Sequence, residues 1–142
     1  MSALTAETAL QLISVAREYA ATLDTPMAFA IVDAGGHPVA MLRMDGASLL
    51  AATTVLAKAR TAVFCQRPTH VTVERASRFP EVWSSLASTA VPPLLLSMGG
   101  FPLECHGQIV GGFASSGGSG EQDIEVSQQA LEAWTHVQEI AR

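Results

Sequence analysis

Glycine is concentrated in the last third of the chain, where eight of the eleven glycines lie between Gly99 and Gly120. Glycine allows tight turns and the close approach of two backbones. Three short apolar runs, residues 94–98, 101–106 and 109–115, alternate with these glycines, a pattern typical of strands joined by tight turns. This third therefore predicts a three-stranded β-meander whose backbone lies close to a ligand or to a neighbouring chain.

The N-terminal third predicts a helix followed by a hairpin. Thr5 is the expected N-cap of an amphipathic helix that stops near residues 24–26, because apolar residues then recur at spacings of three and four. Two apolar runs follow, residues 27–33 and 38–44, and Ala34-Gly35-Gly36-His37 between them is typical of a hairpin turn. We expect two antiparallel strands here.

The middle of the chain is predicted to be helical. Apolar residues recur at helical spacing over residues 49–63, in a segment of small residues that indicates a closely packed helix. Pro68, Pro80 and the pair Pro92-Pro93 interrupt the region that follows, so only brief helical turns are expected at residues 72–79 and 81–89.

A last helix is expected to begin near Ser119 or Gly120, with Glu121, Asp123 and Glu125 in its first turns, where acidic groups suit the helix dipole. The order is then helix, two strands, helices, three strands, helix. The predicted architecture is a single α/β domain of the α+β type over residues 1–142, with a five-stranded, mainly antiparallel sheet flanked by helices.

Composition predicts a homo-oligomer. Hydrophobic residues make up 49% of the chain and charged residues 15%, against roughly 25% charged in an average soluble protein. Large exposed apolar patches usually mark interfaces, and subunit contacts would bury the surface that so few charges leave uncovered. The net charge of −5 argues against nucleic acid and anionic membranes as partners, since both require Lys and Arg to neutralise phosphates.

The compartment expected from the sequence is the cytoplasm. Glu7 lies where a signal peptide would be hydrophobic, and the longest uncharged apolar-leaning stretch, residues 47–57, is far shorter than a membrane span. Cys65 and Cys105 make no disulfide framework or metal-ligand pattern, so both are expected to be buried thiols.

Six segments of the chain resemble the GlcG/HbpS family. In the first half they are Val32-Asp33-Ala34-Gly35-Gly36-His37, Arg43-Met44-Asp45-Gly46-Ala47 and Lys58-Ala59-Arg60-Thr61-Ala62. In the second half they are Gly99-Gly100-Phe101-Pro102-Leu103, Gly107-Gln108-Ile109-Val110-Gly111-Gly112 and Ser116-Gly117-Gly118 with Gln122-Asp123.

The resemblance implies a profilin-like fold, shared with the C-terminal domain of PduO-type proteins, and a tetramer or an octamer. It also implies that the chain binds a small molecule, with noncovalent haem as the candidate cofactor, although the task of many members is unknown. The chain departs from the family pattern at Cys105-His106, where an aliphatic residue followed by Asp or Asn is more usual.

Lys58 and Asp45 are the candidate catalytic residues, because each interrupts small, apolar sequence and belongs to a segment that resembles the family. A carboxylate and an ammonium brought together at a pocket shift each other's pKa and can transfer protons. The alternative is a structural ion pair or cap.

The candidate ligand-binding residues line the expected pocket, and all but His106 come from the segments that resemble the family: Arg43, Gly46, Gly100, His106, Ser116 and Gly117. Arg43 could anchor a carboxylate or a haem propionate through its planar donors, or it could simply face outward from a strand. Asp123 is expected to cap the last helix.

His106, at a strand end among glycines, is the best-placed axial ligand for a haem iron, and a solvated turn histidine is the alternative. His37 and His136 are expected in solvent, and the pattern around His70 favours neither interpretation. The chain has no C-x-x-C-H motif for covalent haem, no Walker motif and no G-x-S-x-G nucleophile elbow.

Two functions follow as hypotheses. The first is an oligomeric module that binds a small molecule or haem. The second is an enzyme that isomerises, deaminates or hydrolyses a small carbonyl, enol or enamine metabolite, with Lys58 and Asp45 as its acid and base.

Overall fold

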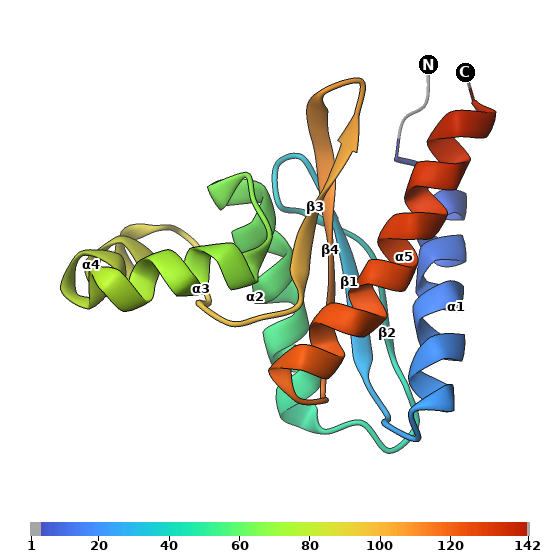
Figure 1. Ribbon diagram of the computed structural model, residues 1–142, viewed down its shortest axis with the longest axis horizontal. Coiled ribbons are helices and arrows are strands. Elements are labelled where there is room, and N and C mark those ends of the chain that lie inside the picture. Colours follow the sequence, from blue (N-terminus) through green and yellow to red (C-terminus); the bar gives the residue numbers. More distant parts are fainter. Residues whose placement is uncertain (1–3, 142) are drawn as a thin grey trace.

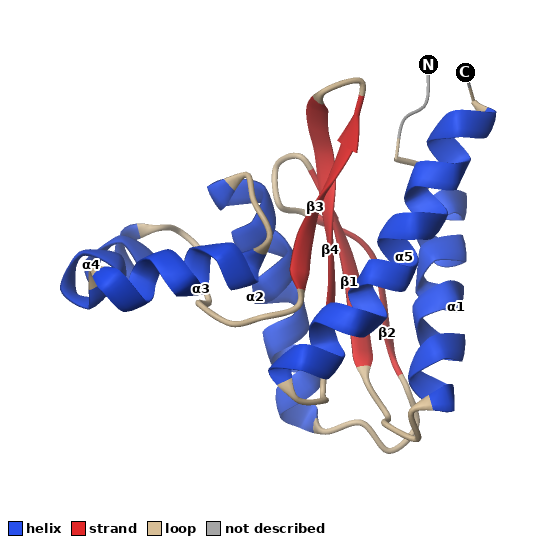
Figure 2. Cartoon of the chain, in the orientation of Figure 1, coloured by secondary structure: helices blue, strands red, loops and turns tan. Residues whose placement is uncertain are grey.

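The computed structural model describes residues 4–141, which form five helices and four strands in three layers (Figures 1 and 2). In chain order the elements are α1 (Ala6–Thr22), β1 (Ala28–Asp33), β2 (Pro38–Arg43), α2 (Leu49–Cys65), α3 (Thr69–Arg78), α4 (Pro80–Thr89), β3 (Gly100–Cys105), β4 (Gln108–Ser116) and α5 (Gly120–Ile140). The α+β class expected from the sequence is confirmed. No helix within the described residues combines the length and the apolar character that crossing a membrane requires.

The four strands make one sheet in the order β2-β1-β4-β3, and every neighbouring pair is antiparallel. Two hairpins, β1–β2 and β3–β4, are joined through β1 and β4, which are therefore the central strands. The glycine-rich β4 pairs along its length with both β1 and β3. The hairpin predicted in the N-terminal third is confirmed, and so is the pairing of the last two strands of the predicted meander.

The prediction of five strands is wrong, because residues 94–98 form no strand. Their backbone groups bond to helices instead of to a neighbouring strand: the Leu94 N–H donates to the Ala87 carbonyl, and the Leu95 N–H donates to the Thr61 hydroxyl at 2.9 Å. Pro92 and Pro93 offer no N–H groups for a sheet. An apolar run between prolines and glycines is therefore not sufficient to identify a strand.

The prediction of brief helical turns in the middle of the chain is also wrong, since α3 and α4 are both complete helices of ten residues. Pro80 does not break a helix because it is at the first position of α4, where a helix makes no use of the N–H. Its effect is to separate α3 from α4 at Phe79. Together α3 and α4 form an arm that extends away from the sheet (Figure 1).

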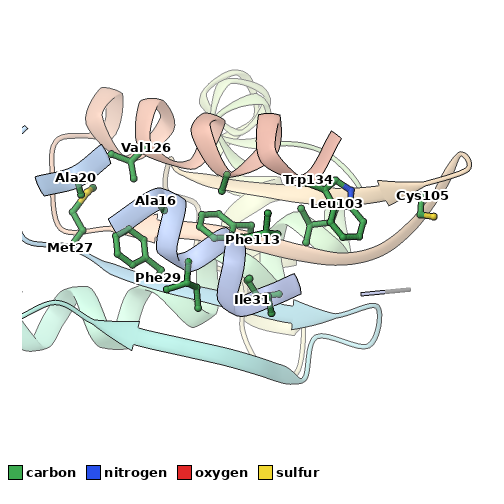
Figure 3. Close-up of a cluster of buried hydrophobic side chains, with 14 residues drawn as sticks. Ala16, Ala20, Met27, Phe29, Ile31, Leu103, Cys105, Phe113, Val126 and Trp134 are labelled. Carbon is green, nitrogen blue, oxygen red and sulfur yellow. The ribbon is translucent and has the colours of Figure 1, made fainter. Parts of the chain in front are cut away.

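Helices α1 and α5 pack side by side on one face of the sheet, and the larger of the two cores lies beneath them (Figure 3). Strand side chains alternate between faces. Phe29 and Ile31 of β1 therefore point into this core together with Phe113 of β4 and Trp134 of α5, and all four are buried. The amphipathic pattern of the first helix is explained by this contact, and Thr5 caps that helix as expected.

Helix α2 packs very closely on the opposite face of the sheet. Its contact residues are Ala51, Val55, Ala59 and Val63. They pack against small side chains of the strands, such as Ala30 and Ala114. At Gly112 a Cβ would lie 2.7 Å from the Ala59 carbonyl oxygen, and at Gly100 it would lie 2.6 Å from that of Lys58. Only glycine allows the α2 backbone to approach the sheet this closely.

Candidate functional site

A buried ion pair joins α2 to α5. The Lys58 Nζ lies 2.8 Å from the Asp123 Oδ2, and the two residues are only 3% and 4% exposed. They are 65 positions apart in the sequence, on helices that cover opposite faces of the sheet. Within the described residues this is the one Lys–carboxylate or Arg–carboxylate pair with both partners buried.

The ion pair is held at the end of β4. The Lys58 ammonium also donates to the Ser115 carbonyl at 3.1 Å, and the Gly118 N–H donates to the Asp123 Oδ1 at 2.9 Å. Ser127, one turn further along α5, hydrogen-bonds the Ser115 hydroxyl at 2.8 Å. Gly117, with a φ of 126°, turns the chain between the strand and the helix in a conformation that favours glycine.

Burial raises the pKa of the Asp123 carboxyl above its ordinary value, whereas the hydrogen bond and the charge of Lys58 and the N–H of Gly118 oppose that rise. The carboxylate is therefore stabilised by its partners against a desolvation penalty that would otherwise favour its protonated form. Such a perturbed group beside a pocket is a recognised sign of a functional site.

The ion pair lies in the wall of a pocket of about 350 Å³, which we name the Lys58–Asp123 pocket. Its walls come from the first half of α2, the segment before β3, the end of β4 and the start of α5, and its polar side chains are those of Ser48, Thr54, Lys58, Ser97, Ser116 and Asp123. Leu50 and Leu95 supply apolar walls. The pocket is within the volume range of small-molecule sites, at its lower end.

The sequence placed Lys58, Ser116 and Gly117 in one pocket, and the structure brings these three together. It does not bring Asp45 to Lys58. Asp45 is exposed in the turn after β2 and lines a different pocket, of about 320 Å³, with Arg17 and Arg43. The carboxylate partner of Lys58 is Asp123.

The other predicted ligand-binding residues lie apart from the Lys58–Asp123 pocket. Arg43 is exposed at the end of β2, and Gly46 is exposed in the turn that follows. Gly100 is buried at the start of β3, where its N–H donates to the Thr69 hydroxyl at 2.9 Å. Its role in the structure is the close approach of α2.

His106 is exposed in the tight turn of the β3–β4 hairpin, with a φ of 51°. It lines a pocket of about 260 Å³ with Glu104, Trp134 and Glu139 among its neighbours. Cys105 beside it is buried and Cys65 is partly buried, and both are thiols. His37 and His136 are exposed, as expected from the sequence.

Asp123 is the site residue that sequence reasoning missed, because it was assigned to capping the last helix. The N-cap is Ser119, whose side chain accepts the Gln122 N–H while the Gln122 side chain accepts the Ser119 N–H. This is a capping box. Its sequence signature is a Ser followed three residues later by Gln, and the chain contains it at Ser119 and Gln122. Once Ser119 is recognised as the cap, Asp123 is left as a carboxylate without a capping role.

We predict that Lys58→Met destabilises the fold in a pH-dependent manner. Removing one partner of a buried pair typically costs about 3–5 kcal/mol, because the other charge is left uncompensated. Without the ammonium, only the Gly118 N–H opposes the effect of burial, so the pKa of the Asp123 carboxyl should rise further above its unfolded value. A folded-state pKa above the unfolded value means that stability falls as pH rises through that interval. The loss measured by urea unfolding should therefore be largest near pH 7.5 and smaller near pH 5.

The control is Arg78→Met, which breaks the exposed Arg78–Glu74 pair on α3. An exposed pair contributes at most about 1 kcal/mol, so this variant should stay close to wild type at both pH values. Equal losses for the two variants, or a Lys58→Met loss that grows as the pH falls, would contradict the assignment of Lys58 and Asp123 as a buried charge pair.

Comparison with known proteins supplies relatives for this fold. Protein GlcG of Escherichia coli K12 is 33% identical over 109 residues, which cover 76% of this chain and 77% of GlcG. Corrinoid adenosyltransferase PduO of Salmonella typhimurium is 33% identical over 123 residues, which cover 87% of this chain and 36% of PduO, so the chain spans about a third of that protein.

A solved complex of PduOC with haem superposes with a TM-score of 0.83 at 32% identity, over 93% of this chain and 95% of PduOC. The family model described as "Haem degrading protein HbpS-like" matches residues 4–132, which is most of the chain. Both halves of the Lys58–Asp123 pair lie within that match. The chain belongs to the HbpS-like family, which is related to GlcG and to the C-terminal part of PduO.

Proposed function

We propose that this chain is a small-molecule-binding protein and that its ligand occupies the Lys58–Asp123 pocket. The observation that carries the proposal is the ion pair itself, which is almost fully buried and yet lines a pocket. A fold gains little from a buried ion pair compared with well-packed apolar side chains. Its position in a pocket wall, beside several hydroxyl groups, supports a role in recognising a polar ligand.

The test is an amide chemical-shift titration of the ¹⁵N-labelled protein with three small probes of different charge: erythritol, erythronate and ethanolamine. We expect at least one probe to shift the amides of residues 116–118 and of the first half of α2. Thr54→Leu should abolish these shifts, because the larger side chain enters the pocket.

The matched control is Thr53→Leu. Thr53 is the neighbouring residue on α2, is exposed and, like Thr54, donates its hydroxyl to the carbonyl four positions back. This variant should bind as wild type does. The proposal fails if no probe shifts the pocket amides, or if Thr54→Leu and Thr53→Leu behave alike.

Catalysis on a small carbonyl, enol or enamine compound is the alternative to binding alone. The pair named for it from the sequence, Lys58 with Asp45, lines two different pockets. An acid–base role in the Lys58–Asp123 pocket would instead fall to Lys58 and Asp123, whose side chains are in contact. Binding is the simpler proposal, because it requires only the contacts described.

Haem is the second candidate ligand, and the likeness to the PduOC complex with haem favours it. A noncovalent haem needs an axial donor and apolar walls. The pocket beside His106 offers the donor, but Glu104 and Glu139 line it and would repel the haem propionates. A larger groove of about 580 Å³ on the α3–α4 arm has apolar walls, but none of its lining residues is a His, Cys, Met or Tyr. The residues described in one chain therefore do not fit a haem bound through His106.

We predict that hemin titrations of the wild type and of His106→Ala give the same Soret position and the same affinity, since His106 is in an exposed, acidic setting. The control is His136→Ala, which removes another exposed histidine from α5. A Soret band that moves in His106→Ala but not in His136→Ala would establish His106 as an axial ligand.

We also propose that the arm formed by α3 and α4 packs against a second copy of the chain. None of the ten residues described in α4 is buried, and Phe79, Val82 and Leu86 expose large apolar side chains. A helix of this length is not stable in water from its own propensity and requires a packing partner. A closed homo-oligomer, a tetramer or an octamer, would supply it and would also account for the low content of charged residues.

We predict that Leu86→Lys shifts the protein toward the monomer, because an ammonium buried in an apolar interface is strongly unfavourable. Size-exclusion chromatography with light scattering at low micromolar concentration measures the mass, for which one chain is 14.9 kDa. The control is Ile140→Lys, which adds the same charge to an exposed apolar position near the end of α5. A wild type that is already a stable, folded monomer would contradict the proposal.

A further inference from the structure

We infer that the Lys58–Asp123 pocket selects an uncharged, hydroxyl-bearing small molecule, such as a short polyol or a hydroxylated carbonyl compound, over a carboxylate or a phosphate. The inference rests on the proposed function, and it adds the chemical class of the ligand. It follows from the hydrogen-bonding capacity that the wall of the pocket leaves open, and from the charge of that wall.

The ion pair retains both donor and acceptor capacity. An ammonium has three N–H groups, and two acceptors are described for that of Lys58, the Asp123 Oδ2 and the Ser115 carbonyl. A carboxylate has about four lone-pair positions, and two donors are described for that of Asp123, Lys58 and the Gly118 N–H. The pair can therefore donate one further hydrogen bond to a ligand and accept others from it.

Two neighbouring hydroxyl groups add acceptor capacity. The Thr54 hydroxyl donates its single proton to the Leu50 carbonyl at 2.9 Å, as helical threonines commonly do. When Thr54 donates to that carbonyl, the proton in its 2.8 Å contact with the Ser116 Oγ comes from Ser116. Ser116, a residue 5% exposed in the pocket wall, then keeps the lone pairs of its oxygen for a donor on the ligand.

The wall thus offers one N–H donor from Lys58 and acceptors from Asp123 and Ser116. A hydroxyl group matches this arrangement, because it can accept from Lys58 and donate to either acceptor. A carboxylate or a phosphate ester has several acceptors and few or no donors, so most of the polar wall would face it without a hydrogen bond. Unpaired polar groups in a desolvated site cost affinity.

The charge of the pocket leads to the same class of ligand. Its side chains include one cation, Lys58, and one anion, Asp123, and they lie in contact, so the wall is neutral as a whole. An anionic ligand would have its charge next to the Asp123 carboxylate without a second cation to offset it. A cationic ligand would meet Lys58 in the same way. An uncharged ligand avoids both penalties.

The experiment compares erythritol with erythronate, two probes that share a four-carbon hydroxylated skeleton but differ in charge at pH 7.5. Both are titrated into the ¹⁵N-labelled full chain, and binding is read from the amides of residues 116–118. We expect millimolar binding of erythritol and binding of erythronate that is at least tenfold weaker.

Two variants test the two parts of the reasoning. Ser116→Ala removes an acceptor with little change in shape, so erythritol should bind about tenfold more weakly. Asp123→Asn leaves a net positive wall around Lys58, so the preference should reverse and erythronate should bind more tightly than erythritol. Ser77→Ala, at an exposed serine of α3, is the control and should change neither affinity. Should Asp123→Asn fail to fold, the wild-type comparison and Ser116→Ala still decide the question.

The failures of the two proposals are distinguishable. Wild-type erythronate binding that is tighter than erythritol binding, and is abolished by Thr54→Leu, would overturn the ligand class and leave the binding function in place. Erythritol binding that is unaffected by Ser116→Ala would also overturn it. If none of the three probes, erythritol, erythronate and ethanolamine, changes the amide chemical shifts of the pocket residues, the proposed function fails together with the inference.

Discussion

The contact between Lys58 and Asp123 is the interaction on which the arrangement of the site depends. Lys58 comes from α2 on one face of the sheet and Asp123 from α5 on the opposite face. The pair therefore connects the two helical layers at the end of β4. A buried charge is tolerated only while its partner is in place. The positions of α2, β4 and α5 are therefore coupled at this point, and the pocket lies at the junction.

Glycine makes that contact possible. The α2 carbonyl groups of Lys58 and Ala59 pack where Gly100 and Gly112 carry no side chains, and this brings the Lys58 side chain within reach of the Ser115 carbonyl. The two faces of the sheet are consequently built differently. Large aromatic and aliphatic side chains fill the space beneath α1 and α5, whereas alanine, valine and glycine form a thin layer beneath α2.

Much of the fold could be predicted from the sequence, because period and turn residues are local signals. The first helix, both hairpins and the start of α5 at Ser119 follow from them. The errors arose where local signals are ambiguous. Residues 94–98 are apolar, but their N–H groups bond to helices, and Pro80 begins a helix that it was expected to prevent. Of the candidate site residues, Lys58, Ser116 and Gly117 line one pocket. The contact of Lys58 with Asp123 was not predicted, because two residues 65 positions apart have no characteristic sequence spacing.

Most of the α2 residues that pack on the sheet differ from those that line the pocket, and this has a consequence for the variation of the pocket. Val55, Ala59 and Val63 pack this helix on the sheet, the side chains of Ser48 and Thr54 line the pocket, and Ala51 does both. Under the proposed function, a substitution at Thr54 would change the surroundings of the ligand while the contacts of Val55, Ala59 and Val63 with the sheet stay in place. Ser48 and Lys58 differ from Thr54 in this respect, because one caps α2 and the other belongs to the buried ion pair.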